Sequence, residues 1–463
     1  MATKQNIDMV NGPLFKNIWA FSLPLMAANL LQMLFNAADT IVVGRFAGQH
    51  ALAAVGATGS LCFLLISLFN GLSMGTNVIV ARYLGANEYS KVEDSVHTSM
   101  TLSIAGGILI AILGNFISRP MLELMSTPVD IIDMSVLYMK IYFCGMFFGV
   151  IYNFASAVLR AKGDTKRPLY FLIISGLTNA ILNVVFVVFF KMSVAGVAIA
   201  TVISQAIAAT LGWVTLVREN DSTRLYTNKL HINVHICEDI VKIGVPAGIQ
   251  GIVFSLSNVV IQSSINSLGS STIVAGNSAA GNVENFVYTV SMALSQACIT
   301  FTSQNVGANN KQKIKSIMHL TMVLSVVSTF ILGFAAWYFG DFFLSLYTSD
   351  IAVIEAGKIR LFWVALMLFL NIILDIYVSS MRGMGYSSLP TILMIIGICG
   401  IRLAWLFIVF PMHRTLDVIY MCFPISWTIT SIIQGILWYK CYKKTMQTKK
   451  KSYKQYDFLV FIS

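Results

Sequence analysis

The chain has 463 residues, of which 57% are hydrophobic and only 11% are charged, with a formal net charge of +11. A soluble protein of this length would carry charges on roughly a quarter of its residues, so the composition excludes an ordinary soluble domain. Continuous apolar runs such as residues 171–190 favour membrane helices over the short alternating strands of a barrel. The basic residues gather in short connections and at the C-terminus, a placement that reflects membrane orientation, so we expect no nucleic-acid partner.

In chain order, the hydrophobic segments predict an all-α integral membrane protein with twelve transmembrane helices. Most Lys and Arg residues lie on one side of these spans, the side that holds both termini, so we expect both termini in the cytoplasm. The expected location is the inner (plasma) membrane, crossed many times. The predicted spans are 15–38, 50–80, 91–117, 133–159, 168–190, 195–217, 240–266, 273–303, 314–339, 354–381, 389–410 and 417–440.

An internal repeat divides the chain. When the sequence is aligned with itself so that Gly85-Ala86-Asn87 falls on Gly307-Ala308-Asn309, the segment 85–103 matches 307–325 with eight identities in nineteen positions and no gap. An even number of spans per half gives both halves the same orientation, so we expect two six-helix bundles related by a pseudo-two-fold axis along the membrane normal. The predicted organisation is an N-terminal lobe (1–217), a cytoplasmic linker (218–239), a C-terminal lobe (240–441) and a basic cytoplasmic tail (442–463).

The first span carries polar residues on one face. Gln32, Asn36 and Asp39 follow the spacing i, i+4, i+7, which is one side of a helix. An acid within a membrane helix costs about 2.5–3.5 kcal/mol, so such residues usually face a cavity and have a function. We interpret Asp39 as a carboxylate that binds a proton or Na⁺, the alternative being a solvated helix end or a pair with Arg45. The same span contains Pro24, where we expect a kink that can act as a hinge.

Further polar residues in the first half extend this constellation. Asn179 and Asn183 lie one helical turn apart in the fifth span, where they either bind a cation or join helices by hydrogen bonds. Asn153 and Tyr138 in the fourth span are candidate cavity residues, although Tyr138 and its neighbour Tyr142 also fit a packing role.

The second half repeats this pattern only in part. Its seventh span has Pro246 as a second candidate hinge and Asn258 and Gln262 as candidate cavity residues, with Ile261 at the position equivalent to Asp39. The tenth span pairs the candidate cavity residue Asn371 with a second intramembrane acid, Asp375. That acid is either a coupling group or part of an ion pair with Arg382 or Arg402, and Glu284 is either a cavity acid or an interfacial residue.

Enzyme chemistry is not indicated. The sequence contains no phosphate-binding loop of the G-x-x-x-x-G-K-[ST] type, no nucleophile and base set, and no clustered metal ligands. The seven cysteines are scattered, so we interpret them as reduced apolar residues. We expect no cofactor, and an ion gradient of H⁺ or Na⁺ as the source of energy.

Several motifs resemble the multidrug and toxic compound extrusion (MATE) family in order and spacing. They are the segment 24–48, Tyr83-Leu84-Gly85-Ala86-Asn87, residues 159–165 (LRAKGDT) and residues 381–385 (MRGMG). The resemblance implies antiport of H⁺ or Na⁺ against cationic, amphipathic compounds. It also implies that Asp39 is the coupling acid of the first lobe, that Gln32 and Asn179 line that lobe's cavity, and that Asp375 binds a cation in one branch. Two departures concern the ion: Asn183 replaces an acid found in many members, and Phe254 or Ser255 stands where one branch has Glu.

The sequence thus predicts a secondary active exporter of small organic cations that works by alternating access of two lobes, as a monomer in contact with membrane lipid. The alternatives are a lipid-linked saccharide flippase of the same superfamily and, from another class, a passive pore. A flippase is expected to have a more cationic cavity than one lined by Asp and Asn.

Overall fold

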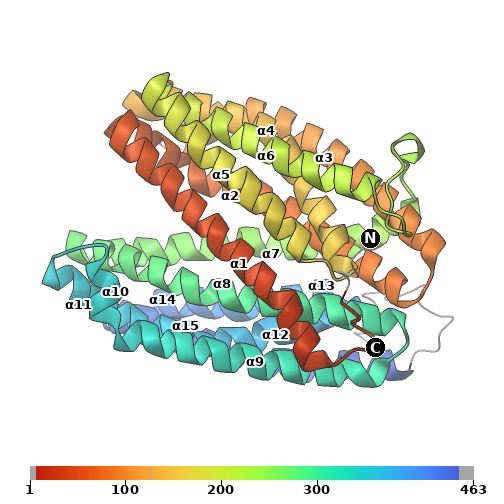
Figure 1. The fold of residues 1–463 in the computed structure, drawn as a ribbon. Coiled ribbons are helices and arrows are strands. Elements are labelled where there is room, and N and C mark those ends of the chain that lie inside the picture. The colour runs from red at the N-terminus through yellow and green to blue at the C-terminus, as the bar shows by residue number, and fades with distance from the viewer. Residues whose placement is uncertain (1–6, 126, 448–463) are drawn as a thin grey trace. The chain divides into compact units, whose positions relative to one another are not determined.

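The computed structural model describes residues 7–125 and 127–447, and within these ranges every regular element is a helix (Figure 1). In the first half these are α1 (Leu14–Val42), η1 (Val43–Ala47), α2 (Gln49–Gly85), α3 (Tyr89–Leu124), α4 (Val129–Ala161), α5 (Lys166–Val184), η2 (Val185–Phe189) and α6 (Ser193–Val217), followed by η3 (Thr227–Lys229). In the second half they are α7 (Val234–Asn266), α8 (Ser271–Gly307), α9 (Lys311–Tyr338), α10 (Gly340–Ser345), α11 (Ile351–Arg360), η4 (Leu361–Ala365), α12 (Leu368–Met384), α13 (Ser388–Met394), η5 (Ile395–Gly400), α14 (Ile401–Ile408) and α15 (Leu416–Gln447). The segments η1, η2, η4 and η5 are π-helical turns, and η3 is a short 3₁₀ helix.

The predicted all-α membrane architecture is confirmed. Within the described residues, eleven helices or helix runs are long and apolar enough to cross a membrane. The remaining predicted span, 273–303, corresponds to α8, which has 37 residues like α2. Polar side chains such as Asn277 and Glu284 lower the apolarity of α8, although its length suffices for a span.

The internal repeat is visible in the helix boundaries. The helices α2, α3, α4 and α5 begin at positions 49, 89, 129 and 166, and the elements α8, α9, α11 and α13 begin at positions 271, 311, 351 and 388, which are the equivalent positions of the repeat in every case. The turns repeat as well. Asn87 and Asn309 have φ values of 56° and 57°, and Gly163 and Gly385 have φ values of 93° and 102°. A left-handed backbone conformation favours Gly or Asn, which explains why these residue types recur at equivalent positions.

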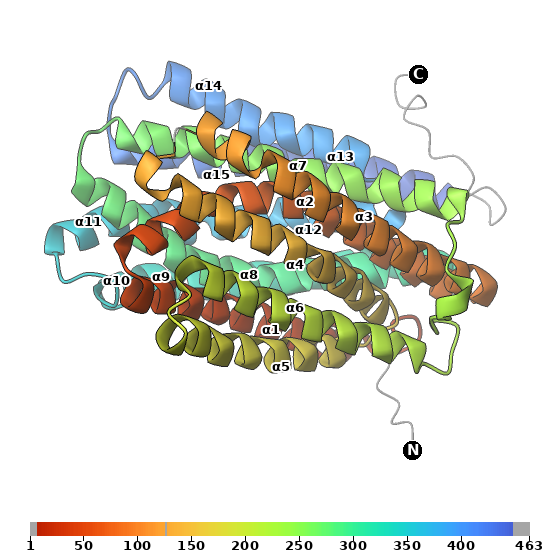
Figure 2. The same ribbon diagram turned by 90° about the horizontal axis from the view of Figure 1, so that it is seen from above.

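Two compact units make up the chain. Leu23–Gly248 form the first unit, and Met9–Ser22 join the residues from Ile249 onward in the second. The first unit is built around a buried cluster that includes Phe143 and Phe154, and the second around one that includes Leu374 and Tyr420. The helices α1 and α7, which are both labelled in Figures 1 and 2, each contribute residues to both units.

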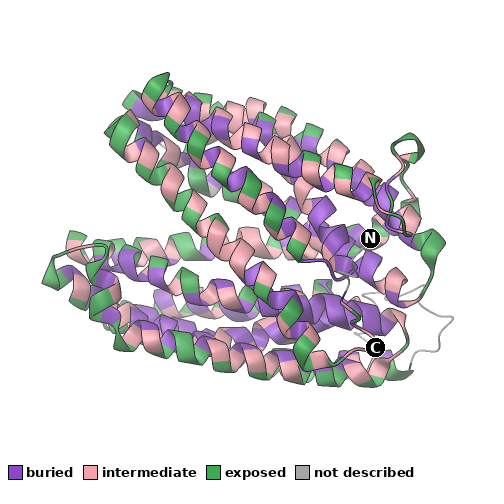
Figure 3. Cartoon of the chain, in the orientation of Figure 1, coloured by how far each residue is buried: buried purple, intermediate pink, exposed green. Residues whose placement is uncertain are grey.

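Apolar side chains are exposed along the middle of the helices and not only at their ends, as the exposed turns in Figure 3 show. On α3 the exposed set includes Leu109, Ile112 and Phe116, and the equivalent residues of α9, Ile331, Phe334 and Tyr338, are exposed too. Exposed apolar stripes of this length are expected of surfaces that face lipid hydrocarbon.

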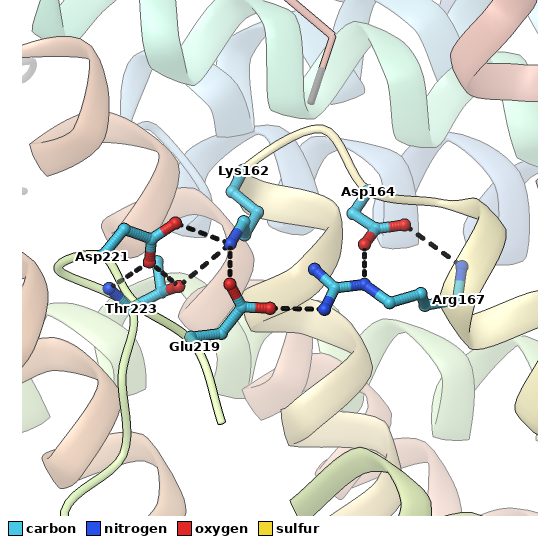
Figure 4. A network of polar contacts seen from close by, with 6 residues as sticks. All are labelled: Lys162, Asp164, Arg167, Glu219, Asp221 and Thr223. Carbon is cyan, nitrogen blue, oxygen red and sulfur yellow. Dashed lines mark hydrogen bonds and ion pairs between the residues drawn. The ribbon is translucent and has the colours of Figure 1, made fainter. Parts of the chain in front are cut away.

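The linker between the halves is an ordered segment that docks on the first unit. The ammonium group of Lys162 donates to Glu219 at 2.7 Å, to Asp221 at 2.7 Å and to the hydroxyl of Thr223 at 3.4 Å (Figure 4). Arg167 extends this network by pairing with Asp164 and Glu219 (Figure 4). The linker therefore lies against the loop between α4 and α5.

A histidine also fixes the linker. The backbone N–H of Tyr226 donates to Nε2 of His97 at 3.1 Å, and Nδ1 of His97 lies 2.7 Å from the carbonyl oxygen of Glu93. This geometry makes His97 a structural residue.

Two helices extend beyond their predicted bounds. The helix α7 begins at Val234, before the predicted start at 240. The helix α15 continues to Gln447, into the predicted basic tail, whose residues 448–463 lie outside the described ranges.

Candidate functional site

An acid and two amides meet within the first unit. The side-chain N–H of Asn183, on α5, donates a hydrogen bond to the carboxylate of Asp39, on α1. The same amide group donates to Oδ1 of Asn179 at 3.2 Å, and Asn179 in turn donates to Oγ1 of Thr201, on α6, at 3.4 Å. Three helices thus position one chain of polar groups, and the predicted residues Asp39, Asn179 and Asn183 are brought together.

The amide oxygen of Asn183 has no hydrogen-bond partner within the described residues, although it is buried. Buried polar atoms are nearly always paired, so an orphaned oxygen beside a carboxylate calls for a ligand with positive charge or a proton. Asp39, Asn179 and Thr201 contribute further oxygen atoms to the same chain of polar groups, and oxygen is the ligand type that hard cations prefer.

Both helices that carry the key residues change geometry just beyond them. The α-helix of α1 passes into the π-helical turn η1 at Val43, and that of α5 passes into η2 at Val185. A π-turn widens the helix and leaves its hydrogen-bond ladder irregular, a feature that is frequent at functional sites. These turns could not be predicted from the sequence, because the Val, Gly and Phe residues in them carry no specific signal.

The other predicted residues of α1 line its exposed side. Gln32 donates to Oδ1 of Asn36 at 3.4 Å, and the hydroxyl of Thr40 donates to the carbonyl of Asn36 at 3.0 Å. Gln32 and Asn36 are exposed, whereas Asp39 is half-buried. Among the described residues the carboxylate of Asp39 accepts from Asn183 and forms no ion pair with Arg45.

Tyr138 and Asn153, on α4, lie in different settings. The ring of Tyr138 stacks on that of Tyr142, with centroids 5.8 Å apart, and packs against an apolar cluster that includes Val187. Asn153 donates to Oδ1 of Asn70, on α2, at 3.2 Å. These contacts fit the packing alternative for Tyr138 and a bond between helices for Asn153.

The second unit holds its acid differently. Oδ2 of Asp375, on α12, accepts hydrogen bonds from the hydroxyl of Tyr288, on α8, and from the amide of Asn371, both at 3.3 Å. Arg382 donates to Oε1 of Gln250 at 2.5 Å and to the hydroxyl of Thr391 at 3.3 Å. Tyr288 was missed from the sequence, because a tyrosine 87 residues from its partner gives no local pattern.

A second polar network lies about one helical turn away along α8, since its acid Glu284 precedes Tyr288 by four residues. The guanidinium of Arg360 lies 2.7 Å from Oε2 of Glu284, and it also donates to Oδ1 of Asn277. Tyr420 donates to the same Asn277 oxygen at 2.9 Å, and the amide of Asn277 donates to Gln262 at 2.9 Å. Glu284 is therefore the partner of a largely buried arginine.

Of the predicted residues on α7, Gln262 joins this network and also donates to Asn266 at 2.9 Å, whereas Asn258 is exposed. Arg360 was missed in the sequence because it lies near the start of a span and resembled an ordinary loop charge. Arg402 is buried against the rings of Phe423 and Trp427, at 4.2 and 5.6 Å from their centroids.

In the part of the chain that the structure describes, no cluster of three His, Cys, Asp or Glu residues is placed so that it could hold a metal ion. The two prolines lie inside helices as predicted, Pro24 in α1 and Pro246 in α7. They are next to the points where these helices pass from one unit to the other, between Ser22 and Leu23 in α1 and between Gly248 and Ile249 in α7.

Comparison with known proteins follows the same division into halves. The profile of the MatE family matches residues 24–185 and again residues 246–408. The chain is 28% identical over 360 residues to the probable multidrug resistance protein YpnP of Bacillus subtilis, covering 77% of this chain and 80% of the relative. It is 29% identical over 408 residues to the probable multidrug resistance protein YoeA of the same organism, with coverages of 85% and 86%. A crystal structure of MATE in complex with MaL6 has the same fold, with a TM-score of 0.90 at 20% identity, over 96% of this chain and 100% of the other.

Proposed function

Because the chain belongs to the MatE family, we propose that it is a secondary active multidrug exporter that exchanges H⁺ or Na⁺ for cationic, amphipathic organic compounds. The names of the relatives YpnP and YoeA support export of drug-like compounds as the cargo class. An ion gradient provides enough energy for this work, since a membrane potential of 100 mV is worth about 2.3 kcal/mol per charge.

The contact between Asp39 and Asn183 carries the proposal. It places an intramembrane carboxylate beside a buried amide oxygen that lacks a partner. A proton on Asp39 can be shared with that oxygen, and a Na⁺ ion can bind both groups together with Asn179 and Thr201. Either event neutralises the carboxylate, so the site responds to the coupling ion.

The proposed cycle follows from this neutralisation. With Asp39 ionised, the first lobe attracts a cationic substrate and keeps its surroundings hydrated. Ion uptake removes the negative charge, the affinity for an organic cation falls, and the substrate leaves on the outer side. The ion and the substrate need only prefer different states of the protein for this exchange to work.

The prolines provide the mechanical element of the proposal. Proline lacks the N–H that an internal helix position donates, so a helix bends more easily at this point. Pro24 and Pro246 lie within two residues of the points where α1 and α7 pass between the two compact units. A bend at Pro24 or Pro246 changes the course of the helix near the point where it passes from one unit to the other.

Asp375 is the candidate for a second ion site. Its hydrogen-bond partners Tyr288 and Asn371 are neutral donors, and the positive charge of Arg382, seven residues further along α12, also acts on it. The exposed residues Gln32, Asn36 and Asn258 are proposed to contact substrate. We propose no cofactor, a monomeric protein, and an inner-membrane location with cytoplasmic termini, the last from the distribution of basic residues.

The flippase alternative receives less support from the charges. A site for pyrophosphate would need arginines free to bind it. Arg360 is instead paired with Glu284, and Arg402 lies against aromatic rings and donates to Ser426 at 3.2 Å.

Ethidium movement into inside-out membrane vesicles tests the function. Vesicles from cells that express the chain receive an imposed pH gradient and, in a separate experiment, a Na⁺ gradient. We expect uptake driven by one of the two gradients, which identifies the ion. We expect the Asp39→Asn variant to lose this uptake at normal expression, because its side chain cannot be ionised.

The matched control is Asp130→Asn, which makes the same chemical change at an exposed acid in the first turn of α4. We expect it to transport like the unmodified protein. Full activity of Asp39→Asn would refute the coupling role of this acid. Absence of uptake in the unmodified protein under both gradients would refute multidrug export and direct attention to a lipid cargo.

A further inference from the structure

A groove of about 800 Å³ lies on the second unit between α12 and α15. Its walls are largely apolar and include Ile373 on α12 and Ile432 and Ile436 on α15. Ile432 and Ile436 are 61% and 58% exposed, in the middle of a helix that is long and apolar enough to span a membrane. The groove therefore opens toward the region that lipid chains occupy.

Two contacts define the floor of the groove. At Gly435 an added Cβ would stand 3.4 Å from the ring of Tyr377, so the missing side chain leaves the space above this ring open. The hydroxyl of Ser431 donates to the carbonyl of Leu370 at 3.1 Å and holds α15 against α12. The groove is thus built into the packing of two helices and is not a gap between mobile side chains.

Charge is present at one end only. Lys440 and Lys443 line the groove at i and i+3 of α15, so they lie on one side of the helix. Both are exposed, and Tyr439, a residue type typical of the membrane interface, lines the groove beside them. The sequence adds Lys449, Lys450 and Lys451 shortly after this end. A ligand of this groove therefore has a long apolar part and one negatively charged end.

The length of the groove selects the class of ligand. From Thr428 to Lys440 the helix rises roughly 18 Å, which is close to the roughly 15 Å thickness of one leaflet of the hydrocarbon core. We propose that this groove is a binding site for an anionic glycerophospholipid, with an acyl chain along the isoleucines and the phosphate on Lys440 and Lys443. Basic pockets between membrane helices are known to bind such headgroups.

A lipid bound in the groove would contact α12, the helix that carries Asp375. Ile373 and Tyr377 face the groove two residues before and after Asp375, so they lie on the opposite side of the helix from this acid. A lipid in the groove therefore stabilises one packing of α12 against α15 without touching the acid itself.

Native mass spectrometry of the full-length protein in detergent tests the site, with dioleoylphosphatidylglycerol and dioleoylphosphatidylcholine as probes of equal chain length. Each lysine near a lipid phosphate contributes about fivefold, so we expect the anionic lipid to bind up to roughly 30-fold more tightly than the zwitterionic one. The Lys440→Gln/Lys443→Gln variant should lose this preference and retain the weaker binding. The Gly435→Leu variant, which fills the groove without changing charge, should lose tight binding of both lipids.

The matched control is Lys166→Gln/Lys315→Gln, which removes two exposed lysines near the starts of α5 and α9. We expect it to keep the preference for the anionic lipid. An equal loss in this control would show a general charge effect and overturn the proposal. Unchanged preference in the Lys440→Gln/Lys443→Gln variant, whose exposed positions do not endanger folding, would overturn it as well.

Discussion

Substitution of Gly71 by alanine tests the close contact of α2 with the first half of α7. An added Cβ at Gly71 would lie 2.3 Å from the carbonyl oxygen of Gly244 and 2.5 Å from the backbone nitrogen of Gly248. At Gly75 it would lie 2.4 Å from the carbonyl oxygen of Ile240. Ordinary contacts of a Cβ begin near 3.4 Å, so even one methyl group forces these backbones apart by about 1 Å. Small residues at four-residue spacing allow membrane helices to approach in this way.

The magnitude follows from a comparison with Gly59 on the same helix, where no atom lies within 4 Å of the added Cβ. Both alanine variants gain the same helix propensity, up to ~1 kcal/mol, so their difference isolates the steric cost. Overpacking of this kind costs about 1–3 kcal/mol. We expect Gly71→Ala to melt a few degrees below Gly59→Ala in thermal unfolding of the detergent-solubilised protein. Equal melting temperatures, or a more stable Gly71→Ala, would refute the reasoning.

Three further predictions concern charged groups. Replacing Lys162 by Met removes the buried cation that pairs with Glu219 and Asp221, so we expect docking of the linker to weaken by about 2–4 kcal/mol. The loss is smaller than for a fully buried ion pair because Asp221 is half exposed. Backbone amides of the linker should then exchange hydrogen faster, and unchanged exchange would contradict this. Burial raises the pKa of Asp221, but the hydrogen bonds from Lys162 and Thr223 together lower it by more, so that the pKa lies below its ordinary value of 3.8. The backbone amides of the linker should therefore exchange hydrogen slowly above pH 4, and the linker should loosen only as the pH falls through this lowered pKa. Loosening near pH 6 would exclude Asp221 as the cause. Arg360→Met should destabilise the protein by about 3–5 kcal/mol in thermal unfolding, and adding Glu284→Gln should recover part of the loss; a double variant as unstable as the single one would exclude an unpaired carboxylate as the cause.

Much of the fold could be predicted from the sequence, because membrane helices are recognisable by their length and by their apolar composition. The predicted span 50–80 lies within α2, and the span 273–303 lies within α8. The repeat, found from motifs such as Gly85-Ala86-Asn87, reappears in the helix starts. Helix ends were less accurate, since α7 and α15 continue into segments whose polar residues suggested loops.

The site could be predicted only where its residues share a helix. The i, i+4 spacing of Asn179 and Asn183 identified them, but nothing local indicated that Thr201 completes the chain of hydrogen bonds. Arg360 and Glu284 are 76 residues apart, so neither charge revealed the other. Pairing across helices depends on packing, which a single sequence does not display.

The two halves share a scaffold but not its chemistry, and this asymmetry bears on the mechanism. The positions that the repeat makes equivalent to Asp39, Asn179 and Asn183 hold Ile261, Ile401 and Trp405, so the second half has no counterpart of the first acid site. Conversely, the ion pair of Arg360 and Glu284 occupies positions equivalent to Tyr138 and Cys62. Matching helix boundaries show that the fold tolerates either set of side chains. A carboxylate held by neutral amides can change its charge when an ion binds, whereas a carboxylate held by an arginine is already neutralised. The proposed coupling step therefore belongs to the first lobe, with Asp375 as the candidate for a second ion in the other.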